Sequence, residues 1–171
     1  TLHERFFEDN TKQLNLFVMG VGNVGEKFIE QIHQQKKFLK ENLKINLRVV
    51  ALSNSRKMHF DEDGISLKDW QTVLNNGETA NQELFIAKVK ELNLRNSIIV
   101  DITANESVSK TYEQYLKQSV GVVTCNKIAC SSAYDNYKNL KNLSRQYNAP
   151  FLFETNVGAG LPIIDTVKNL I

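Results

Sequence analysis

One stretch decides the fold of this chain: Leu16-Phe17-Val18-Met19-Gly20-Val21-Gly22-Asn23-Val24-Gly25. Apolar, strand-forming residues come first, a G-x-G-x-x-G spacing follows, and a helical pattern begins at Glu26. In a dinucleotide-binding turn of this kind, the first glycine permits a tight turn, the second lets a pyrophosphate approach the backbone, and the third lets the helix pack closely on the sheet. The free N–H groups and the positive dipole end of the helix then bind the phosphates. The stretch therefore predicts a nucleotide-binding site made by Gly20, Gly22, Asn23, Val24 and Gly25.

The composition is typical of one globular domain and argues against several partner classes. The 171 residues are 42% hydrophobic and 23% charged, with a net charge of +2. So small a charge implies neither nucleic acid nor an anionic membrane as partner, and no apolar run is long enough to span a bilayer. Cys125 and Cys130 are the only cysteines, and the first residues of the sequence lack the basic start and apolar core of a signal peptide. We interpret them as reduced thiols rather than metal ligands, and we expect a cytoplasmic protein.

Strand and helix patterns alternate along the chain. We expect a short helix near Trp70, an acidic surface turn at Asp61–Gly64, and otherwise irregular structure between Ser53 and Gln82. Alternation at this spacing predicts an α/β fold, a Rossmann-type doubly wound parallel sheet in a single cofactor-binding domain, residues 14–171, after a lead-in or linker, residues 1–13. The expected strands are 14–19, 47–52, 97–102, 120–123 and 150–153. The expected longer helices begin at 26, 83, 107, 131 or 132, and 161.

In a parallel sheet, ligands bind beyond the carboxyl ends of the strands. Each of those ends carries a polar or glycine-rich segment, so we expect these segments to converge on one edge. They are Gly20–Gly25, Ser53–Lys57, Thr103–Asn105, Thr124–Lys127 and Glu154–Gly160.

The end of the second strand bears on the choice of cofactor. An acid there selects NAD by accepting a hydrogen bond from the ribose 2′-OH, but Ser53 is followed by no acid until Asp61. Arg56 and Lys57 stand where a 2′-phosphate would need cations. These residues favour NADP, with use of both cofactors as the alternative; exposed loop residues with no ligand would look the same.

Several motifs together resemble the homoserine dehydrogenase family over residues 14–171. The glycine stretch resembles the start of that family's cofactor domain. The later motifs follow in order and at similar spacing, and the long first helix resembles the bifunctional aspartokinase–homoserine dehydrogenases. These motifs are Asp101-Ile102-Thr103-Ala104, Asn126-Lys127 and Asn156-Val157-Gly158-Ala159-Gly160-Leu161-Pro162-Ile163.

The resemblance implies an NAD(P)-dependent oxidoreductase that reduces aspartate 4-semialdehyde to homoserine, on the route to threonine and methionine. It implies that Thr103 and Ala104 lie along the cofactor, and that Lys127 lies close to nicotinamide and substrate with a role in proton transfer. It also implies a sodium site, whose ligands would be Glu154 and the backbone carbonyls of Val157, Ala159 and Leu161. Oxygen ligands from a carboxylate and a glycine-loosened loop suit such a hard cation.

The family's substrate-binding region is absent from this sequence. We therefore expect cofactor binding without useful turnover from these residues alone, and a homo-oligomer in the parent protein. Two alternatives stay open. One is the cofactor domain of another two-domain dehydrogenase, such as aspartate-semialdehyde dehydrogenase, which would need Cys125 or Cys130 as a nucleophile. The other is a non-enzymatic NAD(P)-binding regulator.

Overall fold

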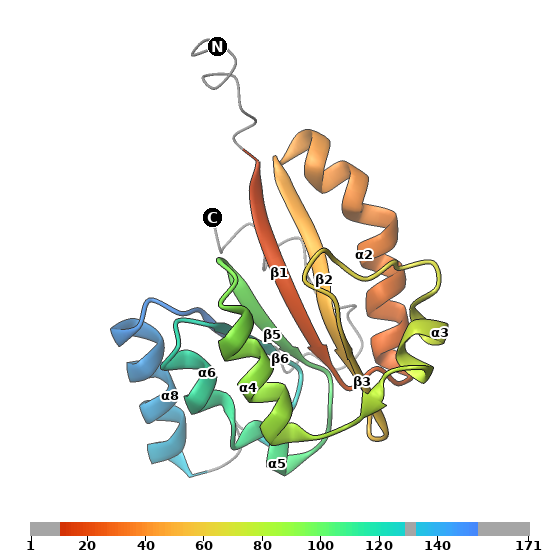
Figure 1. Ribbon diagram of the computed structural model, residues 1–171. Helices are drawn as coiled ribbons and strands as arrows, with labels where there is room; N and C mark the ends of the chain where they lie inside the picture. Colours follow the sequence, from red (N-terminus) through yellow and green to blue (C-terminus); the bar gives the residue numbers. More distant parts are fainter. Residues whose placement is uncertain (1–10, 129–132, 154–171) are drawn as a thin grey trace.

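The computed structural model describes residues 11–128 and 133–153, and a mixed sheet lies at their centre (Figure 1). Its seven strands have the order β4-β3-β2-β1-β5-β6-β7. The strands are β1 (Lys12–Met19), β2 (Ile45–Ser53), β3 (Lys57–Phe60), β4 (Glu78–Thr79), β5 (Ser97–Asp101), β6 (Gly121–Thr124) and β7 (Phe151–Phe153). The helices are α2 (Asn23–Asn42), α3 (Trp70–Asn75), α4 (Gln82–Leu92), α5 (Glu106–Ser109), α6 (Tyr112–Leu116) and α8 (Tyr134–Gln146).

The five strands expected from the sequence pair in parallel. β1 lies between β2 and β5, and β6 and β7 continue the sheet on the β5 side. The order reverses at β1, so the carboxyl ends of β1 and its neighbours flank a crevice where ligands bind in such sheets. The predicted Rossmann-type doubly wound fold is therefore confirmed, and β1 starts at Lys12, two residues before the expected start at Leu14.

The region expected to be irregular adds two antiparallel strands to this sheet. β3 pairs antiparallel with β2, and β4 pairs antiparallel with β3. The reversal is fixed at Asn54, whose side-chain oxygen accepts hydrogen bonds from the backbone N–H groups of Arg56 at 2.8 Å and Lys57 at 2.7 Å. Asparagine favours such turns because its side chain can bond to the backbone two residues on. The short helix at Trp70 and the turn at Asp61–Gly64 are present as predicted.

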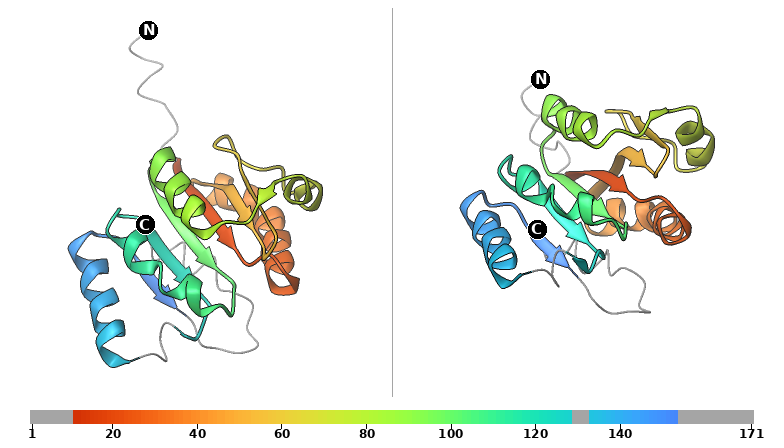
Figure 2. Two further views of the ribbon diagram at one scale, coloured as in Figure 1. Left: turned by 60° about the horizontal axis from the view of Figure 1, so that its bottom comes forward. Right: turned by 90° about the horizontal axis from the view of Figure 1, so that it is seen from below.

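Helices cover both faces of the sheet (Figures 1 and 2). Alternate side chains of β1 point to opposite faces, as strand geometry requires. Leu16 and Val18 pack in the cluster beneath α2 and α3, whereas Phe17 and Met19 pack in the cluster beneath α4, α5, α6 and α8. β1 is thus buried on both faces, which fixes its carboxyl end within the molecule.

Two helix predictions need correction. The helix expected from Ser107 to Gln118 is broken into α5 and α6. At the break, the Thr111 hydroxyl donates to the carbonyl of Val108 at 2.6 Å, and such local bonds compete with a continuous helix. Helix α8 begins after Ala133, which makes no side-chain cap, rather than at Ser131 or Ser132. The helix expected from residue 161 lies outside the described residues. Within the described ranges, no helix combines the length and the apolar character needed to cross a membrane.

Candidate cofactor-binding site

The turn between β1 and α2 follows the backbone path that its first glycine was predicted to allow. Gly20 has φ +90°, and its N–H donates to the carbonyl of Ser53 at 2.9 Å. A Cβ at Gly20 would lie 2.7 Å from Cγ2 of Thr103 and 2.9 Å from its backbone nitrogen. Glycine is therefore required twice here, by the positive φ and by the close approach of the loop after β5.

The other two glycines of the motif differ from each other. A Cβ at Gly22 would meet no atom within 4 Å, so the space above this residue is open. A Cβ at Gly25 would lie 2.8 Å from the carbonyl oxygen of Gly20, so this glycine lets α2 pack against the turn itself rather than against the sheet. No side chain caps the start of α2, a helix of 20 residues. Its first N–H groups and its positive dipole end are thus available to an anion above Gly22.

A cavity of about 500 Å³ lies beside this turn. The glycine turn and the ends of β2 and β5 line one part of it, and the start of α4 lines another. Met58 and Phe85 give it buried apolar surface, and the side chain of Asn81 caps α4 by accepting from the N–H of Leu84 at 2.9 Å. The lining residues are Met19, Gly20, Val21, Gly22, Ser53, Asn54, Ser55, Met58, Ala80, Asn81, Gln82, Phe85, Ile102, Thr103, Asn105 and Val108.

This lining includes some of the predicted site residues and adds others. Gly20, Gly22, Ser53 and Thr103 line the cavity, whereas Ala104 is exposed and is not among its lining residues. The contributions of Met58, Ala80–Gln82 and Phe85 were missed by sequence reasoning. They lie in and after the antiparallel strands, which the sequence pattern did not reveal. Helix α4 itself was expected from residue 83, and its N-cap Asn81 was a further local signal for its start.

Arg56 and Lys57 lie beside this cavity but differ in their surroundings. Arg56 is exposed, and its backbone carbonyl accepts the N–H of Ala80 at 2.9 Å. The ammonium group of Lys57 donates to the carbonyl of Gly77 at 3.0 Å. Lys57 therefore links β3 to the segment before β4, while the guanidinium group of Arg56 is the more accessible cation.

A buried hydrogen-bond network lies beneath the ends of β5 and β6. Asp101, the last residue of β5, is fully buried. One oxygen of its carboxylate accepts the N–H of Thr103 at 2.7 Å, and the other accepts the hydroxyl of Tyr112 and the amide of Asn126, the latter at 3.2 Å. The hydroxyl of Tyr112 also lies 2.7 Å from that of Thr124. Each donor compensates part of the cost of burying a carboxylate.

Lys127 follows this network directly and is exposed at the same edge of the sheet. The segments after β1, β2, β5 and β6 do converge there, as predicted: Gly20 bonds to Ser53, and the N–H of Cys125 donates to the carbonyl of Asp101 at 3.1 Å. The predicted sodium ligands Glu154, Val157, Ala159 and Leu161 lie outside the described residues.

The environment of Cys125 bears on the nucleophile alternative. Its thiol is partly buried and lies 3.6 Å from the carbonyl oxygen of Asp101. Burial, and then the nearby Asp101 charge, raise the pKa of the Cys125 thiol. A nucleophilic cysteine needs the opposite shift, because the thiolate is the reactive form. Cys125 is therefore poorly suited to covalent catalysis.

Comparisons of this chain with known proteins agree on one family. The sequence profile described as "Homoserine dehydrogenase, NAD binding domain" matches residues 20–154. The bifunctional aspartokinase/homoserine dehydrogenase of Haemophilus influenzae is 39% identical over 171 residues, which cover 99% of this chain and 21% of that protein. The homoserine dehydrogenase of Schizosaccharomyces pombe is 30% identical over 92% of this chain and 43% of its own length.

Solved structures agree with this grouping. A mutant of a hyperthermophilic archaeal homoserine dehydrogenase in complex with NADPH superposes with a TM-score of 0.68 at 26% identity, covering 92% of this chain and 49% of that one. The chain thus spans about a fifth of the Haemophilus influenzae relative and less than half of the Schizosaccharomyces pombe one.

Proposed function

This chain belongs to the family of homoserine dehydrogenase NAD-binding domains, and from that premise we propose that it is the cofactor-binding part of an enzyme reducing aspartate 4-semialdehyde to homoserine. The observation that carries the proposal is the start of α2. It lacks a side-chain cap, and the space over Gly22 is free for at least 4 Å around a hypothetical Cβ. Such a turn, opening on a cavity of about 500 Å³, suits the pyrophosphate of a dinucleotide.

The same family relationship supports the proposal that this chain is part of a longer protein. Relatives named as bifunctional aspartokinase/homoserine dehydrogenases align with this chain over 18–21% of their length. We propose that this chain is likewise a part of a bifunctional, homo-oligomeric enzyme of threonine and methionine biosynthesis, and that it needs a further substrate-binding region for turnover. A cytoplasmic location stays a prediction from the sequence.

Each group at the site has a role in this proposal. A bound nicotinamide cofactor supplies the hydride for the carbonyl carbon. The chain must therefore help to supply a proton for the carbonyl oxygen, and Lys127 is the exposed cationic side chain at the end of β6 that can donate or relay it. Gly22 and the start of α2 bind phosphate, and Thr103 and Ala104 border the cofactor.

Arg56 supports NADP as the preferred cofactor. A guanidinium can bind a 2′-phosphate with two parallel hydrogen bonds. The ammonium of Lys57 already donates to the Gly77 carbonyl. We therefore assign the preference to Arg56 first, with Lys57 in a supporting role and NAD as the second cofactor. A sodium ion at Glu154, Val157, Ala159 and Leu161 remains an implication of the family resemblance.

Activity of the longer protein tests the proposal. We expect the protein to reduce NADP⁺ with homoserine as the hydride donor, followed as absorbance of the reduced nicotinamide. Cofactor binding without oxidation of homoserine would instead support a regulatory NAD(P)-binding protein.

A further inference from the structure

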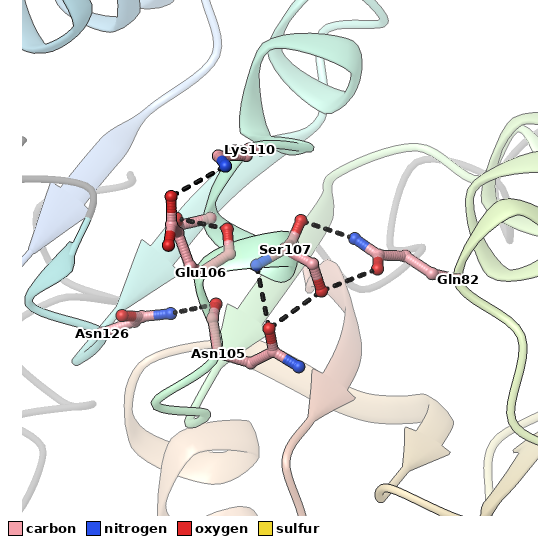
Figure 3. Close-up of polar contacts among 7 residues, drawn as sticks. Gln82, Asn105, Glu106, Ser107, Lys110 and Asn126 are labelled. Atoms are coloured by element: carbon pink, nitrogen blue, oxygen red, sulfur yellow. Dashed lines mark hydrogen bonds and ion pairs between the residues drawn. The ribbon is translucent and has the colours of Figure 1, made fainter.

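The side chain of Asn126 joins the two loops that border the proposed reaction site. Its amide nitrogen donates to the carboxylate of Asp101 at 3.2 Å and to the backbone carbonyl of Asn105 at 3.0 Å, and it lies 3.4 Å from the hydroxyl of Thr103 (Figure 3 shows the bond to Asn105). Asn126 is only 3% exposed. An amide among three acceptors has little rotational freedom, so its position is fixed by the loop after β5.

The same residue also fixes its own loop. The backbone N–H of Asn126 donates to the hydroxyl of Thr124 at 2.8 Å, and its side-chain oxygen accepts the N–H of Ile128 at 3.1 Å. Lys127 stands between these two bonded positions. The backbone around Lys127 is therefore held by the Thr124 hydroxyl on one side and by the Asn126 side-chain oxygen on the other, although the Lys127 side chain is exposed.

The loop after β5 is braced at its other end. The side-chain oxygen of Asn105 accepts from the N–H of Ser107 at 2.8 Å and from its hydroxyl at 2.9 Å. Gln82 of α4 donates to the Ser107 carbonyl at 2.7 Å, and the Ser107 hydroxyl lies 3.1 Å from the Gln82 side-chain oxygen (Figure 3). Polar contacts thus run from the start of α4, beside the cavity, to Asn126.

We propose that Asn126 is a positioning residue for the chemical step, which sets the Lys127 backbone relative to the Thr103–Asn105 loop. The inference rests on the proposed function, because it gives Asn126 its effect through Lys127. A displacement of about 1 Å at a reacting group can cost about 10²-fold in rate. Loss of the Asn126 amide frees the Lys127 backbone from one loop and leaves the glycine turn untouched.

The hydrogen bonds that remain without the Asn126 side chain distinguish a role in positioning from a role in folding. Without the Asn126 amide, the Asp101 carboxylate still accepts from the N–H of Thr103 and the hydroxyl of Tyr112. The bond from the backbone N–H of residue 126 to the Thr124 hydroxyl does not need the Asn126 side chain. An Asn126→Ala variant should therefore fold and bind cofactor.

The experiment compares Asn126→Ala with Asn139→Ala in the longer protein. Asn139 is exposed on α8 and serves as the matched control. We expect Asn126→Ala to lower kcat for homoserine oxidation about 10²-fold, with the NADPH dissociation constant within about twofold of wild type and the melting temperature within a few degrees. Asn139→Ala should leave all three unchanged. Should Asn126→Ala unfold, the milder Asn126→Ser is measured in its place.

A double-mutant cycle asks whether Asn126 acts through Lys127. We expect Asn126→Ala to slow the wild type but to add less than about twofold to the loss in a Lys127→Ala background, since residues acting as a unit are not additive. Multiplicative losses would overturn the proposal, as would a normal kcat in Asn126→Ala or unfolding of both Asn126 variants. The wild-type rate itself tests the proposed function, whereas these ratios test the role of Asn126.

Discussion

The glycine turn and the edge formed by β5 and β6 lie side by side, yet they are built in opposite ways. The turn depends on the absence of side chains: a Cβ at Gly20 would lie 2.7 Å from Cγ2 of Thr103, and a Cβ at Gly22 would meet no atom within 4 Å. The β5–β6 edge depends on side chains that are present, since Asp101, Thr124 and Asn126 are buried and bonded to one another or to shared partners. The first region should therefore fail when atoms are added, and the second when they are removed.

The largest effect should come from removing a side chain at the β5–β6 edge. We predict that Lys127→Ala lowers kcat in the longer protein by about 10²–10⁴-fold, the usual contribution of general acid catalysis. Cofactor affinity and melting temperature should change little, because Lys127 is exposed. Steady-state kinetics and a thermal melt of the same preparation measure this; a near-normal kcat, or a variant that unfolds, would give Lys127 a structural role instead.

Adding one methyl group should distinguish two glycines within the turn. Gly20→Ala places a Cβ against the Thr103 loop at φ +90°, and the clash and the strain together should cost about 2–5 kcal/mol of unfolding free energy. Gly22→Ala should cost less than about 0.5 kcal/mol, because its Cβ meets nothing. Urea denaturation of the two variants measures the difference. Equal losses would mean that the close approach at Gly20 has no energetic weight.

The cations beside the cavity should differ in which cofactor they affect. We predict that Arg56→Ala weakens NADP binding by roughly tenfold or more and spares NAD, because a charge-assisted hydrogen bond is worth about 1.5–3 kcal/mol. Lys57→Ala should also weaken NADP binding, but by less than Arg56→Ala, since its ammonium donates to the Gly77 carbonyl. Titration calorimetry of the two variants with NADP and NAD gives the four dissociation constants. An equal loss of affinity for NADP and NAD in Arg56→Ala would show that Arg56 does not bind the 2′-phosphate.

The smallest effect concerns the thiol beside Asp101. The pKa of Cys125 is raised by burial, so its thiolate fraction at pH 8 should be lower than that of an unperturbed thiol. In a Cys130→Ser background, Cys125 should react with iodoacetamide several-fold more slowly than free cysteine at pH 8, and the rate should still rise above pH 9. Rapid alkylation at pH 7 would instead support Cys125 as the nucleophile of a different dehydrogenase.

Much of the fold was predictable because its signals are local. The strand, glycine spacing and helix around Gly20 are contiguous, and the buried parallel strands appear as apolar runs such as 97–101. β3 and β4 were not predictable in the same way. They are short, and β4 has two exposed residues, so no hydrophobic period marks them, and their pairing depends on contacts with β2 and on the turn at Asn54.

The residues of the candidate site also differ in whether a local sequence signal could identify them. Gly22 could be assigned from spacing, since its function is the absence of a side chain. The role of Asn126 could not, because its partners Asp101 and Asn105 lie 25 and 21 residues away and meet it only through adjacent parallel strands. The break between α5 and α6 was likewise hidden, since it arises from hydroxyl groups that a periodicity argument treats as neutral.

Calorimetric titration of NADPH into this chain and into its Gly22→Val variant tests the central claim most directly. The space over Gly22 is open, so valine should leave the unfolding transition near that of wild type while placing a branched side chain where the pyrophosphate is proposed to bind. We predict binding to the wild-type chain and a loss of at least about tenfold in the variant, about 1.4 kcal/mol. Unchanged affinity in a folded Gly22→Val variant would contradict the assignment of the cofactor to this turn.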